Sequence, residues 1–416
     1  MRVIAFLLPQ FHPIAENDAW WGKGFTEWTN VSRAVPQFPG HDQPRLPADL
    51  GFYDLRLPEA RQAQADLAAA YGIHGFCYHH YWFSGRRVLE RPLADMLSSG
   101  QPDFPFCICW ANENWTRRWD GGDDHILLRQ DYSDQHDFDF IHDLAAPMRD
   151  DRYIRVNGRP LLIVYYSAAM PNPLRSTTVW RQQARELGLG ELYLVRAETH
   201  VRPGKHPDPR HLGFDAAVEF PPHAIPFDNL REVVLPAEAP FRGTLVDYPA
   251  AVNASLQRPT PGYPLLRGVF PDWDNTPRRR ELGTVFRGST PEAYGDWLAG
   301  MIEWTRRHHT SDEQQDLDFG DSPTSSSSIR RRPTDAPPPA SMCVAASCAV
   351  PTRLSNRSPL QCCSVRYLTS PSHNRAPRAN VPSALRARAR DPCSSFFLYP
   401  RIAFAGLVCV MSGSPW

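Results

Sequence analysis

The chain of 416 residues carries 45 Lys and Arg against 45 Asp and Glu, so its formal charge is zero. Twelve Arg, no Lys and three Asp lie beyond residue 320, which gives that part a charge of +9 and leaves −9 on the rest. A mildly acidic globular part argues against nucleic acid or an anionic membrane as its partner. The length allows one large α/β domain with an appendage.

The first apolar run, Arg2–Pro9, is short and is followed by no small-x-small cleavage site, so a buried strand explains it better than a signal peptide. The longest apolar run of the tail, Ile402–Met411, is about half the length that spans a bilayer, and we expect no stable membrane insertion. Cys77, Cys107 and Cys109 lie in apolar runs without metal-ligand or CxxC spacing, which indicates a reducing compartment. We therefore expect a cytoplasmic protein.

Apolar strand-like runs alternate with helical patterns over the first three quarters of the chain. The predicted strands are Arg2–Pro9, Gly75–Phe83, Phe104–Cys109, Arg159–Tyr166, Leu192–Glu198, Asp215–Phe220 and Leu265–Phe270. The predicted helices are Pro58–Tyr71, Glu90–Ser99, one capped by Ser133, Thr177–Leu187 and one capped by Thr290. Seven alternations favour a (β/α)₈ barrel that lacks its eighth strand over an open doubly wound sheet. The first turn, Leu8–His12, has no glycine fingerprint for a dinucleotide.

The alternation ends abruptly near Gln314, where a mixture of Ser, Arg, Pro, Ala and Cys without a sustained period begins. This part is either a disordered basic tail or the product of a frame shift near Gln314. Six cysteines, the lack of lysine and the loss of pattern in mid-barrel favour the frame shift. We predict a barrel domain at residues 1–313 and a low-complexity tail at 314–416.

A barrel without its eighth strand exposes two strand edges unless something pairs with them, so we expect poor solubility or partial unfolding.

The stretch Trp110–Gly121 follows the third predicted strand and holds three Trp, two Asn, two acidic residues and two Arg. Indole faces with amide and carboxylate edges suit a sugar, which has apolar C–H faces and a rim of hydroxyls. The alternative is a Trp-rich loop that merely packs over the end of the barrel. We favour a binding site.

The carboxyl ends of barrel strands, with the loops beyond them, form the active face of such folds. The candidates at these positions are His12, Glu27, Trp28, His80, Tyr81, Trp110, Asn112, Glu113, Trp115, Tyr166, Glu198, Glu219 and Asp272. Each alone is more simply explained as a solvated carboxylate or a satisfied core side chain, but their shared placement strengthens the joint case. Several carboxylates and indoles without a nucleophile triad are typical of carbohydrate chemistry.

Other chemistries find less support. Asp272-Trp273-Asp274 is an Asp-x-Asp that could hold a metal and a nucleotide-sugar diphosphate, but Asp137–Asp139 and Asp316–Asp318 match the same pattern. The histidines show no metal-ligand spacing, and there is no P-loop or Gly-x-Ser-x-Gly. We predict no metal site and no cofactor.

From residue 1 to about residue 313 the chain resembles the WbsX-type proteins, because several long motifs occur in order. These are Leu8–Pro13, Trp21–Trp28, His80–Phe83, Trp110–Trp115 and Phe220–Pro222. WbsX-type proteins are usually described as glycosyltransferases of lipopolysaccharide O-antigen and polysaccharide synthesis. They are similar to the endo-α-mannosidase-like glycoside hydrolases of family 99, which are (β/α)₈ barrels. The resemblance implies an oligosaccharide or another sugar-containing substrate with a mannose-like or deoxy-sugar unit.

The chain departs from that family at the last barrel strand. There the family carries Asn-Glu-Trp-x-Glu-Gly, whose two glutamates are the catalytic pair in the hydrolase relatives, and this sequence has no such motif. The resemblance therefore implies that the catalytic pair is lost and that activity is low or absent. Glu113 and Glu219 remain as candidate catalytic carboxylates, better suited to hold a sugar than to act as acid and base. The other active-face residues are candidate substrate ligands.

Two further functions stay open. The first is a carbohydrate-binding barrel that never catalyses, with Trp28, Trp110 and Trp115 as stacking platforms. The second is a metal-dependent nucleotide-sugar transferase that uses Asp272 and Asp274.

Overall fold

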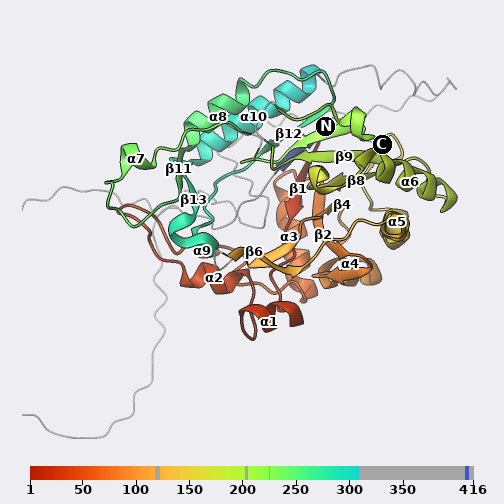
Figure 1. Ribbon diagram of the computed structural model, residues 1–416, viewed down its shortest axis with the longest axis horizontal. Helices are drawn as coiled ribbons and strands as arrows, with labels where there is room; N and C mark the ends of the chain where they lie inside the picture. Colours follow the sequence, from red (N-terminus) through yellow and green to blue (C-terminus); the bar gives the residue numbers. More distant parts are fainter. Residues whose placement is uncertain (118–121, 202–204, 224, 309–407, 412–416) are drawn as a thin grey trace, which may run out of the picture. The chain divides into compact units, whose positions relative to one another are not determined.

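Parallel strands joined by helices form the centre of the structure (Figure 1). The computed structural model describes residues 1–117, 122–201, 205–223, 225–308 and 408–411. Within these residues the parallel strands of the main sheet are β1 (Arg2–Leu7), β2 (Gly75–Phe83), β4 (Phe106–Trp110), β8 (Arg159–Val164), β9 (Tyr193–Glu198), β10 (Ala216–Glu219) and β12 (Leu265–Val269). Each pairs in parallel with the next, in the order β1-β2-β4-β8-β9-β10-β12. This arrangement confirms the predicted barrel-type fold.

Helices cover the outside of these strands (Figure 1). They are α3 (Pro58–Ala70), α4 (Arg91–Ser99), α5 (Asp134–Arg149), α6 (Pro173–Glu186), α8 (Tyr248–Leu256) and α10 (Pro291–His308). Because both faces of the strands are covered, a strand such as β4 is buried at all five positions, which explains its continuous apolar sequence. None of the described helices is both long and apolar enough to cross a bilayer.

The structure confirms the two predicted helix caps, Ser133 and Thr290. The Ser133 hydroxyl accepts the backbone N–H of His136 at 3.3 Å, and the Thr290 hydroxyl accepts that of Ala293 at 3.2 Å. Helix α6 starts four residues before its predicted start. There the Asn172 side chain accepts the N–H of Arg175 at 3.1 Å, and a proline occupies the first turn, so the cap lies earlier than the apolar pattern suggested.

Several elements were not predicted. They are α1 (Ala15–Trp21), α2 (Glu27–Arg33), β3 (Arg86–Val88), β5 (Trp115–Arg117), β6 (Gly122–Leu128), β7 (Arg155–Val156), α7 (Arg231–Val234), α8, β11 (Thr244–Asp247), α9 (Thr276–Arg279) and β13 (Thr284–Arg287). All of these elements are short, and most are much shorter than the window of about 11–18 residues over which periodicity is read, so sequence periodicity alone does not detect them.

Strands β11 and β13 pair in parallel beside the main sheet. They have an apolar cluster of their own, formed by Phe38, Leu235, Phe241, Leu245 and Val285. The cluster ties the loop after α2 to the segment after β12, although more than 200 residues separate them in the sequence. Both segments border the carboxyl ends of the barrel strands.

A short antiparallel strand, β14 (Val408–Met411), lies between β12 and β1. Val410 is opposite Val3 on one side and Arg267 on the other. No eighth parallel strand joins the main sheet among the described residues, but the two edges that the sequence left exposed are both paired here. The rest of the predicted tail falls outside the described residues, and its boundary at residue 314 stays a prediction.

Replacing Cys409 with proline should destabilise the barrel. Cys409 is opposite Ile4 and Gly268, and proline lacks the N–H that a strand between two neighbours needs. We expect a loss of about 1–3 kcal/mol for each backbone group left unpaired, with increased light scattering on heating. Cys409→Ala keeps the backbone N–H and serves as the control. Equal melting temperatures for the two variants would show that β14 does not support the barrel.

Candidate functional site

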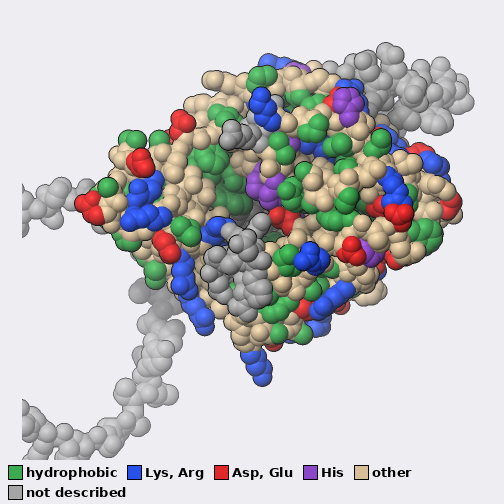
Figure 2. Space-filling model, viewed as in Figure 1, with side chains coloured by type: hydrophobic (Ala, Val, Ile, Leu, Met, Phe, Trp, Pro, Cys, Tyr) green, Lys and Arg blue, Asp and Glu red, His purple; other side chains and the backbone are tan. Residues whose placement is uncertain are grey.

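The carboxyl ends of the parallel strands surround a cleft of about 310 Å³. Its lining comes from Phe6 in β1, from His79 and Tyr81 in β2, from residues after β1, β4, β8, β10 and β12, and from α1, α2, β5, β6 and α9. Figure 2 shows hydrophobic side chains in a hollow of this face, with histidine side chains beside it. The position agrees with the active face of a barrel.

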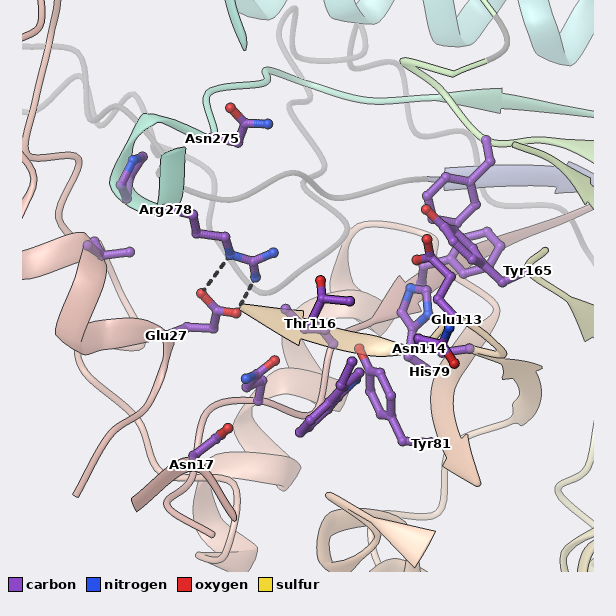
Figure 3. Close-up of a pocket in the computed structure, with 18 of the residues that line it drawn as sticks. Asn17, Glu27, His79, Tyr81, Glu113, Asn114, Thr116, Tyr165, Asn275 and Arg278 are labelled. Carbon is purple, nitrogen blue, oxygen red and sulfur yellow. Dashed lines mark hydrogen bonds and ion pairs between the residues drawn. The ribbon is translucent and has the colours of Figure 1, made fainter. Parts of the chain in front are cut away.

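One side of the cleft carries Glu113, which follows β4. Its Oε1 lies 3.1 Å from Nε2 of His200. Tyr165 and His79 line the same side (Figure 3), with their rings 6.1 Å apart. The Tyr165 hydroxyl lies 3.4 Å from Nε2 of His223. A carboxylate held by an imidazole, next to a phenol, provides acceptors and donors for sugar hydroxyls.

The opposite side carries an ion pair between Glu27 and Arg278 (Figure 3). Arg278 Nε donates to Glu27 Oε2 at 3.2 Å, and its Nη2 donates to Oε1. Burial raises the pKa of the Glu27 carboxyl, and the Arg278 charge opposes that shift. Because Glu27 begins α2 and Arg278 belongs to α9, the pair joins the connection between β1 and β2 to the segment after β12.

Aromatic side chains form much of the wall between these two sides. The Trp115 ring lies 5.8 Å from Trp20 and 5.2 Å from Tyr81, in edge-to-face arrangements. Trp21 and Trp273 also line the cleft. Indole and phenol rings at this spacing offer flat apolar surfaces to the C–H face of a ring-shaped ligand.

The structure brings four of the predicted site residues into the cleft. They are Glu27, Tyr81, Glu113 and Trp115, and they come from three segments that are far apart in the sequence. Their lining of one cleft agrees with the expectation that these active-face positions converge.

Two other predicted residues, His80 and Trp110, point away from the cleft. His80 is buried against α5, with Nε2 3.5 Å from Asp143. The Trp110 indole packs in the core and donates to the Trp82 carbonyl at 3.2 Å. Adjacent residues of a strand face opposite sides, so His80 cannot join Tyr81 in the cleft. His79, two residues before Tyr81, lines the cleft instead.

Asn112 and Tyr166 also lie outside the cleft lining. The Asn112 amide nitrogen donates to the Tyr166 carbonyl at 2.8 Å, and its oxygen accepts the Tyr166 N–H at 2.7 Å. The Tyr166 ring lies 4.2 Å from the His200 ring. Asn112 thus fixes the loop after β8, and Tyr166 supports the histidine that holds Glu113.

His12 and Trp28 belong to packing around the first loop. His12 is buried, and burial lowers the pKa of its imidazole. Trp28 packs on Phe11 and Tyr53 and donates to the Tyr53 carbonyl at 2.8 Å. Neither side chain lines the cleft.

The Glu219 carboxylate is buried in an ion-pair network. Its Oε2 accepts from Arg267 Nε at 2.9 Å and from the Gly268 N–H at 3.1 Å, and its Oε1 accepts from Arg258 at 2.8 Å. Arg258 also lies 2.7 Å from Glu198. For Glu198, burial acts to raise the carboxyl pKa, but Arg258 and Tyr263 together lower it. This network joins β9, β10 and β12.

The two aspartates of the Asp-x-Asp are bridged by Arg45. Its Nη1 donates to Asp272, and its Nη2 lies 3.7 Å from Asp274. Asp274 lines the cleft and also accepts from Gln43 at 2.7 Å and faces His41 at 2.8 Å, whereas Asp272 is outside the lining. Burial acts to raise the pKa of Asp274, but His41, Arg45 and Thr276 lower it.

Sequence reasoning missed His79, Tyr165, His200, Asn17 and Arg278 at this site. Residues two apart on a strand face the same side, so the choice of Tyr81 also indicates His79, and the sequence could have predicted this residue. Tyr165 directly follows β8, inside the predicted strand Arg159–Tyr166. Asn17 and Arg278 lie on short helices that only the tertiary structure brings to the cleft, and His200 lies in a loop that it brings to Glu113. Within the described ranges, no three His, Cys, Asp or Glu side chains are grouped so as to hold a metal ion.

A family model described as glycosyltransferase WbsX matches residues 3–316. Two proteins described as uncharacterized protein WxcX, from two strains of Xanthomonas campestris pv. campestris, are 47% identical to the chain over 301 residues. These matches include 72% of this chain but 43% of each relative, so the chain spans less than half of their length.

Among solved structures, a GH99 endo-alpha-mannosidase from Bacteroides thetaiotaomicron has a TM-score of 0.42 and 13% identity, covering 72% of this chain and 80% of that protein. A glycoside hydrolase-like protein has a TM-score of 0.40 and 13% identity, covering 62% and 74%.

Glu219→Gln and Glu113→Gln should separate a framework carboxylate from a cleft carboxylate. We expect Glu219→Gln to cost about 3–5 kcal/mol of unfolding free energy, because it leaves buried Arg267 without its counter-charge. Glu113→Gln removes a partly exposed carboxylate and should change stability by less than about 1 kcal/mol. Chemical denaturation of both variants checks this. A stable Glu219→Gln protein would contradict the framework role.

Proposed function

Because the chain belongs to the WbsX glycosyltransferase family, we propose that it binds a glycan in this cleft. The substrate would be an oligosaccharide or another sugar-containing molecule of lipopolysaccharide O-antigen or surface-polysaccharide assembly. The observation that carries the proposal is the convergence of Glu113, Tyr165 and an aromatic wall in one cleft at the carboxyl ends of the strands.

The cleft suits a glycan in both size and chemistry. A volume of about 310 Å³ lies at the small end of the range of small-molecule sites. Trp20, Trp115 and Tyr81 offer ring faces, while Glu113 and Tyr165 offer polar groups that can exchange hydrogen bonds with hydroxyls. We propose that Glu113, oriented by His200, is the central sugar ligand.

Turnover of this chain should be weak. Glycosidic bond chemistry with opposed groups needs one carboxyl group as acid and a second as base or nucleophile. Both oxygens of Glu27 are bonded to Arg278, and Glu219 is bonded to Arg258 and Arg267. Neither carboxylate is available to serve with Glu113, and the family's Asn-Glu-Trp-x-Glu-Gly motif is absent from the sequence.

The two alternative functions fare differently. A carbohydrate-binding barrel that never catalyses remains compatible with the cleft, with Trp115 as its platform; Trp28 and Trp110 pack elsewhere. A transferase that holds a metal with Asp272 and Asp274 is not favoured, because Arg45 already bridges both carboxylates.

We also propose a cytoplasmic location. Cys77, Cys107 and Cys109 are buried and unbridged in the core, which supports a reducing compartment.

Glu113→Gln should weaken glycan binding. A hydrogen bond to a charged group contributes about 1.5–3 kcal/mol, so we expect affinity for methyl α-mannoside to fall by roughly 10- to 100-fold. Isothermal titration calorimetry measures this. Glu59→Gln, an exposed carboxylate in the first turn of α3, is the matched control and should bind as wild type. Equal affinities of the Glu113→Gln and control proteins would overturn the role given to Glu113.

Restoring the reading frame after Glu313 should restore turnover. If a frame shift occurred near Gln314, one of the other two frames encodes an Asn-Glu-Trp-x-Glu-Gly strand. The repaired chain should then cleave or extend an oligosaccharide, and Glu→Gln changes in the restored motif should abolish this. Absence of the motif from both frames would disprove the frame shift. Binding without turnover in a repaired chain would favour the non-catalytic barrel.

A further inference from the structure

Asn17, on α1, is a buried amide that faces the cleft. Its side chain is fully buried and lines the cleft, yet neither Oδ1 nor Nδ2 has a hydrogen-bond partner among the residues that the structure describes (Figure 3). Buried amides in folded proteins are nearly always paired, because an unpaired one loses its hydration without compensation. An amide in this state next to a cleft points to a ligand that supplies both an acceptor and a donor.

Thr116 presents a second group of this kind. Its hydroxyl is buried, lines the cleft and likewise lacks a partner within the described ranges. The pairing of β5 with β6 is irregular between Trp115 and Thr116, so both side chains of these consecutive residues reach the cleft. A regular strand would have turned one of them away.

Flat aromatic surfaces accompany these two groups. On α1, Trp20 follows Asn17 by three residues and Trp21 follows it by four, so all three side chains share a helix face. The Trp20 ring contacts Trp115, the neighbour of Thr116 in the chain, at 5.8 Å. Asn17 and Thr116 therefore border one aromatic surface.

The charged residues that the close-up labels on the Asn17 side of the cleft compensate each other. They are Glu27 and Arg278, which form an ion pair (Figure 3). An amide, a hydroxyl and indole faces without net charge suit the hydroxyl rim and C–H face of a neutral pyranose. Among the described residues that line the cleft, the cation offered to a phosphate or carboxylate is Arg278, and Glu27 compensates its charge.

We propose that Asn17 and Thr116 form a second sugar subsite, for a neutral pyranose adjacent to the ring held by Glu113. This inference rests on the proposed glycan function. It makes Asn17 a residue that determines the length of the glycan recognised, and it gives Glu113 and Asn17 separate rings to bind. Glu113 lies with His79 and Tyr165 on the other side of the cleft (Figure 3).

Titrations with methyl α-mannoside and an α-linked mannobiose test the subsite. Wild type should bind the mannobiose about tenfold more tightly, because only the disaccharide reaches Asn17 and Thr116. Asn17→Ala and Thr116→Val should each remove most of that gain and leave the affinity for methyl α-mannoside within about twofold. Glu113→Gln should weaken both ligands. Equal affinity of wild type for the two sugars, or unchanged mannobiose binding by Asn17→Ala, would overturn the subsite while the glycan function stands.

A measurement without ligand makes the result independent of the chosen sugar. Asn17→Leu replaces an unpaired buried amide with an apolar side chain of similar size and should raise the melting temperature of the free protein. Asn112→Leu is the matched control: this amide is equally buried but fully bonded to Tyr132 and Tyr166, so its loss should lower the melting temperature. A drop for Asn17→Leu like that for Asn112→Leu would show a structural role and overturn the inference. If wild type binds neither sugar, the proposed function fails for mannose-type glycans, and the subsite falls with it.

Discussion

The in-register parallel pairing of the barrel strands is the constraint on which the cleft depends. Cys77 of β2 is opposite Phe6 of β1 and Cys107 of β4, and His79 is opposite Cys109. This register aligns the carboxyl ends of neighbouring strands, so the residues that follow them meet at one end of the barrel. Side chains also alternate along each strand. One set, which includes His79 and Tyr81, points to the inside of the barrel, and the other set packs on helices.

Charge is used in two different ways around this end of the barrel. Glu198 and Glu219 form ion pairs with Arg258 and Arg267, and that network connects β9, β10 and β12. In the cleft itself, Glu27 is paired with Arg278. Among the described residues, the charges at this end of the barrel are therefore largely compensated by partners within the protein.

The packing of the loops explains why the cleft has an aromatic wall. The β5–β6 pair, α1 and the end of β2 meet through Trp20, Trp115 and Tyr81, and the pair of Glu27 with Arg278 holds the far side. These loops are stabilised by one another rather than by the barrel alone. The wall thus depends on contacts between segments almost 100 residues apart, which a change in any of them would disturb.

The sequence by itself determined the barrel-type alternation, the seven parallel strands β1, β2, β4, β8, β9, β10 and β12, and the caps of α5 and α10. It also pointed to the Trp110–Gly121 stretch as a candidate site region. These features follow from local periodicity and capping chemistry. Only the tertiary structure decided that Glu113 and Trp115 face the cleft while Trp110 and Asn112 support it, and that Glu219 is held by arginines. The reason is physical: burial and partners depend on neighbours from distant segments, and Arg258, Arg278 and His200 reach their carboxylates only after the strands have paired.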